Sequence, residues 1–175
     1  KAGLDLADDA MLARRLFISD LSLAADHFAD WSDRRMKAEL DKVDLMAMRV
    51  RERIHVCVKT RIGLNSPHKE AIRRLLSFLS LPHNAGLVTR ITWRSCSVIW
   101  YAIGDRSTDW NYYSKRAILA SVYLSTTMYW LSDVGNGLGD YPETWAFLDR
   151  RIEDVLKSFG LLGRLRARFS DFPTP

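Results

Sequence analysis

Glu52 and His55 are the first residues whose types and spacing suggest chemistry. A Glu-x-x-His pair places a carboxylate and an imidazole on one helix face, and di-iron bundles use two such pairs with two further glutamates. The chain has four histidines, and none of the other three follows a glutamate by three residues. We therefore interpret Glu52 and His55 as a salt-bridging surface pair and expect no metal site.

Other catalytic patterns are missing from the sequence. It holds no G-x-S-x-G elbow, no phosphate-binding loop and no G-x-G-x-x-G fingerprint. Spacing does not decide for or against a Ser/His/Asp triad, because its members come from distant segments, but nothing supports one. We interpret His83, in "LPHN", as a polar helix-capping residue. The sequence predicts a protein that is not an enzyme and has no cofactor.

The stretch "GDRSTDWNYYSKR", residues 104–116, is the most unusual in the chain. Asp109 or its neighbours are suited to cap the next helix by accepting hydrogen bonds from free backbone N–H groups. That role does not explain the adjacent Trp110, Tyr112 and Tyr113. Neighbouring helical positions point in different directions, so at least one of these rings should face outward. An exposed aromatic beside polar groups is typical of a partner-binding hot spot.

Composition indicates one globular domain. The chain has 175 residues, 47% of them apolar, and a net charge of +5 from 26 basic and 21 acidic residues. That charge fits an anionic partner, but the basic residues are spread over the whole chain. Cys57 and Cys96 have apolar neighbours, which indicates reduced core thiols of a cytoplasmic-type compartment. We expect no membrane span and no signal or transit peptide.

Helical periodicity runs along most of the chain, and no segment alternates as a strand would. Apolar positions mark a face in four predicted helices: Leu21, Ala24, Phe28 and Trp31 in 20–40; Val50, Ile54, Cys57 (or Val58) and Ile62 after a cap at Asp44; Ala71, Leu75, Leu76, Phe78 and Leu79 after Ser66 and Pro67; and Trp145, Leu148, Ile152 and Val155 after Asp140 and Pro142. Further helices are expected over 6–17, over 84–103 up to Gly104, and to about 131 after the 104–116 stretch. The sequence therefore predicts an all-α fold.

The start of the chain leaves little room for a DNA-reading head. About twenty residues precede the long helix at residue 20, and a three-helix head does not fit there. We therefore expect no nucleic acid as a partner.

The end of the chain predicts a membrane-binding tail. Apolar side chains fall within an arc of about 100° on a helical wheel, flanked by arginines. The face of the preceding helix points elsewhere, so we expect a break at Gly160 and a separate amphipathic helix. Arginine stems beside an apolar arc are suited to anionic lipid surfaces. The predicted membrane-binding residues are Leu161, Leu162, Leu165, Phe169, Arg164 and Arg168.

Three segments resemble the Coq-nine family, the lipid-binding accessory proteins of ubiquinone biosynthesis. They are "LPHN" (81–84), "WYAIGDRSTDWNYYSKRAILASVYLSTT" (100–127) and "ETWAFLDRRIEDV" (143–155), and the likeness is looser over 20–61. The resemblance implies a TetR-like bundle of about seven to nine helices that forms homodimers and no longer reads DNA. It also implies an apolar pocket for an isoprenoid quinone or another lipid, and a partnership with the pathway's di-iron hydroxylase.

The resemblance also implies sites at matched positions. The hydroxylase-binding patch would comprise Ile99, Trp100, Asp109, Asn111, Tyr112 and Tyr113. Many relatives have Trp where Tyr112 stands and Phe where Trp110 stands, so aromatic character is kept. Helix 110–131 is apolar on more than one side, which is typical of a central helix, and the expected lipid pocket includes Leu124, Met128, Tyr123 and Trp130. Helices 110–131 and 143–157 are expected to form the dimer interface.

Three regions are expected: a remnant of a helix-turn-helix in 1–19, a ligand-binding and dimerisation domain in 20–159, and the tail in 160–175. The preferred function is a non-enzymatic protein that binds a lipid at a membrane and presents it to the hydroxylase. The alternative is a truncated, ligand-responsive TetR-type transcriptional regulator. The expected location is the cytoplasmic side of a bacterial inner membrane or the mitochondrial matrix side.

Overall fold

The computed structural model describes residues 21–106, 110–137 and 139–170, with side chains described for 21–106, 112–137 and 139–157. These residues form six α-helices and three short 3-10 helices, and no strand: α2 (Leu21–Leu40), η1 (Leu45–Ala47), α3 (Val50–Leu64), η2 (Ser66–His68), α4 (Lys69–Leu79), η3 (Pro82–Asn84), α5 (Ala85–Ala102), α6 (Trp110–Ser132) and α7 (Pro142–Ser170). The all-α prediction is confirmed, and the described residues hold six of the seven to nine α-helices expected for the whole chain. The helix predicted over 6–17 lies outside the described residues.

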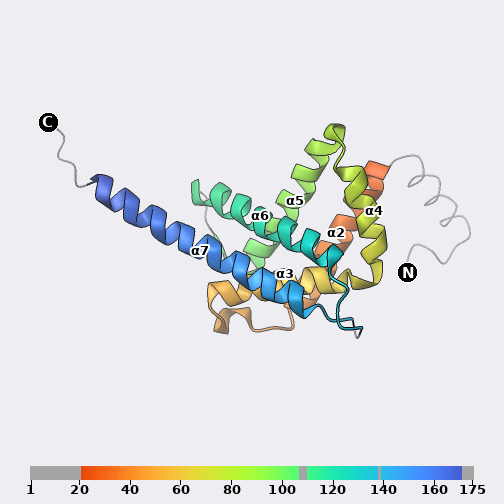
Figure 1. The fold of residues 1–175 in the computed structure, drawn as a ribbon, viewed down its shortest axis with the longest axis horizontal. Helices are drawn as coiled ribbons and strands as arrows, with labels where there is room; N and C mark the ends of the chain where they lie inside the picture. The colour runs from red at the N-terminus through yellow and green to blue at the C-terminus, as the bar shows by residue number, and fades with distance from the viewer. Residues whose placement is uncertain (1–20, 107–109, 138, 171–175) are drawn as a thin grey trace, which may run out of the picture.

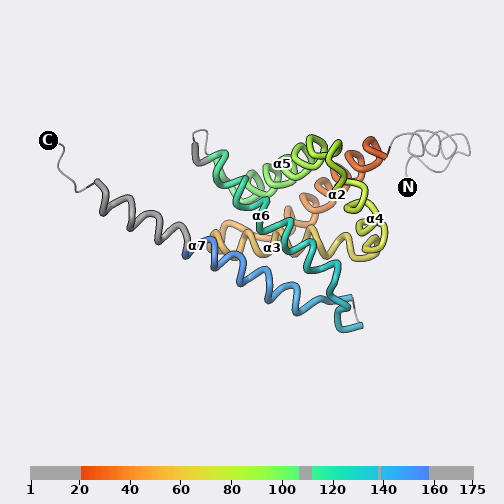
Figure 2. Tube along the Cα trace, turned by 45° about the horizontal axis from the view of Figure 1, so that its top comes forward, coloured from red at the N-terminus to blue at the C-terminus, as the bar shows by residue number. Residues whose placement is uncertain are grey.

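Helix α3 passes through the middle of the bundle and contacts α2, α5, α6 and α7 (Figure 1). Helices α6 and α7 pack side by side and are joined by the loop 133–141 (Figure 2). Five helices each contribute at least one side chain that is almost completely buried: Met36, Val58, Ile99, Trp130 and Leu148. The core is therefore continuous from α2 to α7.

Several predicted features are confirmed. Gly104 follows α5 with φ at +87°, in the left-handed region that glycine favours after a helix. Trp145, Leu148 and Ile152 are buried on α7. Cys57 and Cys96 are free and buried, and burial raises the pKa of both thiols to about 12.

The buried face of α2 was predicted wrongly. Leu21 is 54% exposed, whereas the buried positions are Ala25, Ala29, Ser32, Asp33, Met36 and Leu40. The polar members are satisfied inside the bundle: Ser32 Oγ donates to Asn65 Oδ1 (3.0 Å), and Asp33 pairs with Arg61. A periodicity analysis counts Asp and Ser as surface residues, so it placed the buried face of α2 on the wrong side of the helix.

Three predicted caps are also corrected. Asp44 accepts hydrogen bonds from the backbone of η1, not from that of α3. At the start of α3, the Glu52 carboxylate accepts a hydrogen bond from the backbone N–H of Arg49, the residue before the helix (2.9 Å). Helix α4 has no side-chain cap at its start, and Ser66 opens η2 instead. His83 is exposed, and the neighbouring Asn84 donates to the Phe78 carbonyl (2.8 Å) near the end of α4.

The break expected at Gly160 does not occur, since α7 is one helix from Pro142 to Ser170. A glycine inside a helix costs only about 1 kcal/mol relative to alanine, and the Leu and Arg residues around it are good helix formers. The side chains of residues 158–170, including the predicted membrane-binding set, lie outside those described.

Candidate functional sites: an apolar cavity and an aromatic surface

A cavity of about 90 Å³ lies inside the bundle and is walled by α2, α3, α4, α5 and α6. Its lining is mostly aliphatic and aromatic, with Ile72, Leu75, Leu76 and Leu79 supplied by α4. Three of the four pocket residues predicted from sequence line it: Tyr123, Leu124 and Trp130.

Met128 is not part of the cavity. Its side chain is 66% exposed. The buried face of α6 is centred near Thr126, Thr127 and Trp130, and Leu124 lies at its edge. A residue four positions on from Leu124 is turned a further ~40° along the wheel, which takes Met128 out of the bundle.

A buried polar cluster borders the cavity. Arg61 and Asp33 are each 3% exposed, and Nη2 of Arg61 lies 3.1 Å from Oδ1 of Asp33. The same Nη2 donates to Ser95 Oγ (3.0 Å), which donates to Asp33 Oδ2 (3.1 Å). Burial raises the pKa of the Asp33 carboxyl, against the opposing effect of Arg61 and Arg94. Arg61 lines the cavity, so a positive charge lies in a mostly apolar lining.

Four rings gather where α5 packs against the start of α6, and we call them the aromatic surface: Trp93, Tyr101, Tyr112 and Tyr113. The rings of Tyr112 and Tyr113 meet edge to face at 5.1 Å, and Trp93 lies 6.0 Å from Tyr113. Tyr101 is 60% and Tyr113 57% exposed. The prediction that at least one ring of the 104–116 stretch faces outward is therefore confirmed by Tyr113.

A buried arginine supports the aromatic surface. The guanidinium carbon of Arg116 lies 3.4 Å from the ring centroid of Tyr112, and its Nε donates to Ser97 Oγ (3.0 Å). Arg116 is fully buried, and Asp105 lies 3.8 Å from its Nη1. A hydrogen bond with Tyr101 lowers the pKa of the Tyr112 hydroxyl, and Arg116 adds to that shift. Tyr112 is thus held in place, whereas Tyr113 is free to contact solvent.

The structure divides the patch predicted from sequence. Ile99 is fully buried and Trp100 is 9% exposed, so both belong to the core and not to a contact surface. Trp100 Nε1 donates to the Lys115 carbonyl (3.1 Å), which ties α5 to α6. Asp109 and the side chain of Asn111 lie outside the described residues. Tyr112 and Tyr113 remain at the surface.

Sequence reasoning missed Trp93, Tyr101 and Arg116. The two rings stand on the preceding helix, so only the tertiary contact between α5 and α6 brings them to Tyr112. The sequence analysis gave Arg116 no role. The one available signal was its position four residues after Tyr112, which places both on one helix face.

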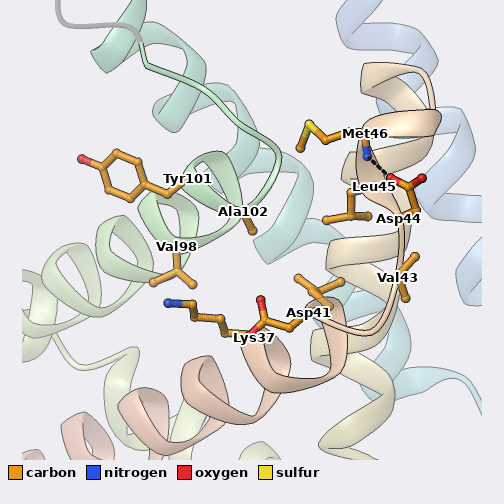
Figure 3. Close-up of a pocket in the computed structure, with 10 residues that line it drawn as sticks. Lys37, Asp41, Val43, Asp44, Leu45, Met46, Val98, Tyr101 and Ala102 are labelled. Carbon is orange, nitrogen blue, oxygen red and sulfur yellow. Dashed lines mark hydrogen bonds between the residues drawn. The ribbon is translucent and has the colours of Figure 1, made fainter.

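A groove of about 530 Å³ adjoins the aromatic surface and shares Tyr101 with it. Figure 3 shows that its walls come from the end of α2 with Lys37, from α5 with Val98 and Tyr101, and from the η1 segment with Met46. Arg53 fixes this arrangement, because it donates to the carbonyls of Met46 (2.9 Å) and Ile103 (3.0 Å). The aromatic surface therefore continues into a concave, partly apolar region.

A second groove, of about 280 Å³ and almost wholly apolar, lies between α3, α6 and α7. Its lining includes Ile54, Ile118, Val155 and Leu156. This groove extends the apolar surface of the bundle along α7 as far as Leu156.

The Glu52–His55 interpretation needs correction. Nδ1 of His55 lies 2.6 Å from Oδ1 of Asp149 on α7, while Glu52 caps α3. Over the described part of the chain, no three His, Cys, Asp or Glu residues are grouped as metal ligands. No helix in that part is both long and apolar enough to cross a bilayer.

These features define an all-α protein built around an apolar cavity, with an exposed aromatic surface at the start of α6. Residues 85–158 match the COQ9 family model, and they comprise α5, α6 and the first half of α7. This match confirms the resemblance to the family found in the sequence.

The curated relatives carry the name of a biosynthetic pathway. The chain is 35% identical over 99 residues to "Ubiquinone biosynthesis protein COQ9, mitochondrial" of Homo sapiens, which covers 57% of the chain and 30% of that protein. It is 30% identical over 151 residues to the Rattus norvegicus protein of the same name, and this match covers 82% of the chain and 47% of that protein. A probable COQ9 of Dictyostelium discoideum is 28% identical over 114 residues, 65% of the chain and 36% of that protein. The chain thus spans less than half the length of these relatives.

Proposed function

We propose that the chain is a non-enzymatic accessory protein of ubiquinone biosynthesis that binds an isoprenoid quinone intermediate or another lipid and presents it to the pathway's di-iron hydroxylase. The observation that carries this proposal is the apolar cavity, because α6 supplies its wall from within the family-matched region. The names of the relatives support the pathway.

The size of the cavity sets a condition for lipid binding. About 90 Å³ is below the ~300–1,000 Å³ of typical ligand pockets, so a lipid has to widen it. Helix α4 is the wall best placed to move outward, since 3-10 segments flank it at both ends. Two hydrogen bonds hold α4 to the end of α6. Arg73 donates to the Leu131 carbonyl (2.5 Å), and Lys69 donates to the Asp133 carbonyl. Lipid uptake is expected to weaken or break these two hydrogen bonds.

The aromatic surface is the proposed hydroxylase contact. Tyr101 and Tyr113 offer large exposed rings on a rigid support, and tyrosine is enriched at interface hot spots. The groove beside Tyr101 gives a partner side chain a place to insert. The aromatic surface therefore has the shape and chemistry of a protein contact.

We assign the tail, residues 160–175, to the membrane surface on the cytoplasmic side of a bacterial inner membrane or on the mitochondrial matrix side. The relatives are named as mitochondrial. Liposome flotation with anionic vesicles tests the tail by comparing the full chain with one that ends at Ser158. Only the full chain is expected to float, and equal binding by both forms would exclude this role.

The whole proposal is tested by reconstitution. Vesicles carrying the hydroxylase and its quinone precursor are assayed with and without the chain. The chain is expected to raise the hydroxylation rate and to form no product alone. Product formed by the chain without the hydroxylase, or a rate unchanged by its addition, would overturn the proposal.

A further inference from the structure

Arg61 has more hydrogen-bonding capacity than its protein partners use. Its side chain is 3% exposed, and Nη2 makes the contacts with Asp33, Ser95 and the Ala29 carbonyl. Nε and Nη1 are buried and have no protein hydrogen-bond partner. Buried N–H groups are rarely left in that state, because the lost hydration is not replaced.

The ion pair does not need all of this arginine. Asp33 also accepts from Ser95, and Nε of Arg94 lies 3.6 Å from its second oxygen. A single nitrogen at the position of Nη2 is therefore enough to balance the carboxylate. The remaining donors of Arg61 are available for another acceptor.

The cavity is where such an acceptor fits. Arg61 is the one charged residue among the described residues that line it. The other polar side chains there are already engaged in part: Thr127 Oγ1 donates to the Tyr123 carbonyl (2.8 Å), and Asn65 accepts from Ser32. The α4 side of the lining is aliphatic. The cavity thus has a donor-bearing wall at α3 and an apolar wall at α4.

We propose that Arg61 selects amphipathic ligands by donating a hydrogen bond to an oxygen atom at the end of an apolar body. This inference rests on the proposed function, in which the cavity holds a lipid. The oxygen is a neutral quinone carbonyl or the anionic oxygen of a lipid carboxylate or phosphate, and either chemistry satisfies the guanidinium. The apolar body then lies among the α4 residues Ile72, Leu75 and Leu76.

The test uses three probes with the full chain in calorimetric titrations: tetramethyl-1,4-benzoquinone, 1,2,4,5-tetramethylbenzene and decanoate. The first two share a carbon skeleton and differ in the two carbonyl oxygens. The wild-type chain is expected to bind the quinone at least about tenfold tighter than the hydrocarbon, as a hydrogen bond to a charged group predicts. Decanoate replaces the neutral oxygen with an anionic one.

Arg61→Lys is the informative variant, because lysine keeps a charge for Asp33 but has a single nitrogen. It is expected to weaken binding of at least one oxygen-bearing probe by about 10- to 100-fold and to leave the hydrocarbon unchanged. The probe that loses affinity identifies the neutral or the anionic chemistry. Arg94→Lys is the matched control, since Arg94 contacts the same carboxylate but does not line the cavity, and all affinities should be retained.

Three results would overturn the inference. The first is wild-type affinity of Arg61→Lys for both oxygen-bearing probes. The second is a wild-type chain that binds the hydrocarbon as tightly as the quinone and decanoate, which decides the matter even if Arg61→Lys does not fold. The third is no binding of any probe by the wild-type chain, which removes the proposed function as well and is thereby distinguished from the other two.

Discussion

The cavity and the aromatic surface use the two ends of one helix. At the start of α6, Tyr113 is exposed beside the fully buried Arg116. Toward its end, Tyr123 and Trp130 line the interior near the buried Arg61. Both sites thus combine aromatic rings with a buried arginine, but one presents its rings outward and the other inward.

Under the proposed function, this difference would place the protein contact and the ligand contact about three turns of helix apart. The outward rings are suited to a protein partner, because large exposed aromatics bind when a partner desolvates them. The inward rings are suited to an apolar ligand, because they line a mostly apolar cavity together with aliphatic side chains. Substitutions in the aromatic surface should therefore leave lipid binding unchanged, and substitutions in the cavity should leave hydroxylase binding unchanged.

The largest effect is expected from Asp33→Ala at the cavity end. The change leaves Arg61 buried without its carboxylate, and removal of one partner of a buried ion pair costs about 3–5 kcal/mol. The free energy of unfolding in urea measures it. Asp30→Ala is the matched control, because the Asp30–Arg34 pair is exposed and should contribute under about 1 kcal/mol. Equal losses in the two variants would show that the buried cluster does not hold this end together.

The next effect is expected from Tyr113→Ala at the aromatic end. Loss of a hot-spot ring costs at least about 2 kcal/mol of binding, or roughly 30-fold in hydroxylase affinity. The unfolding free energy should change little, because the ring is 57% exposed. Val134→Ala, at an exposed apolar position in the loop before α7, should keep full affinity. Undiminished hydroxylase binding by Tyr113→Ala would show that the aromatic surface is not the hydroxylase contact.

Met128 provides a smaller test on the outer face of α6. This exposed methionine lies on a helix expected to form the dimer interface, so Met128→Glu should raise the dimer dissociation constant about tenfold, by placing a charge in the contact. Sedimentation at micromolar concentrations measures the shift, with Val134→Glu as control. A wild-type chain that sediments only as monomer would contradict the dimer.

Much of the fold follows from local signals. Gly104 after α5, Pro142 at the start of α7 and the spacing of Trp145, Leu148 and Ile152 act through the backbone and the 3.6-residue repeat, which a sequence displays directly. The outward ring at Tyr113 followed from the same geometry.

The rest depends on contacts between distant segments. Asp33, Arg61 and Ser95 come from three helices, and charged residues in a sequence indicate surface unless their partners are known. The prediction that Met128 lines the cavity was wrong for a different reason. Met128 lies just past the edge of the buried face of α6, and only the packing of the other helices defines the centre of that face. Tertiary contacts thus determine which charged residues are buried and where the buried face of a helix is centred, and the periodicity of a single helix does not show either.

The central claim is that lipid is held inside the bundle, and the amount of lipid bound per chain tests it most directly. Wild type, Leu124→Trp and Met128→Trp are purified alike, extracted with organic solvent and quantified by mass spectrometry. Because Leu124 lines the cavity and Met128 faces outward, Leu124→Trp should lose most of its lipid while Met128→Trp keeps the wild-type amount. A full complement of lipid in Leu124→Trp, with the fold intact, would contradict the account.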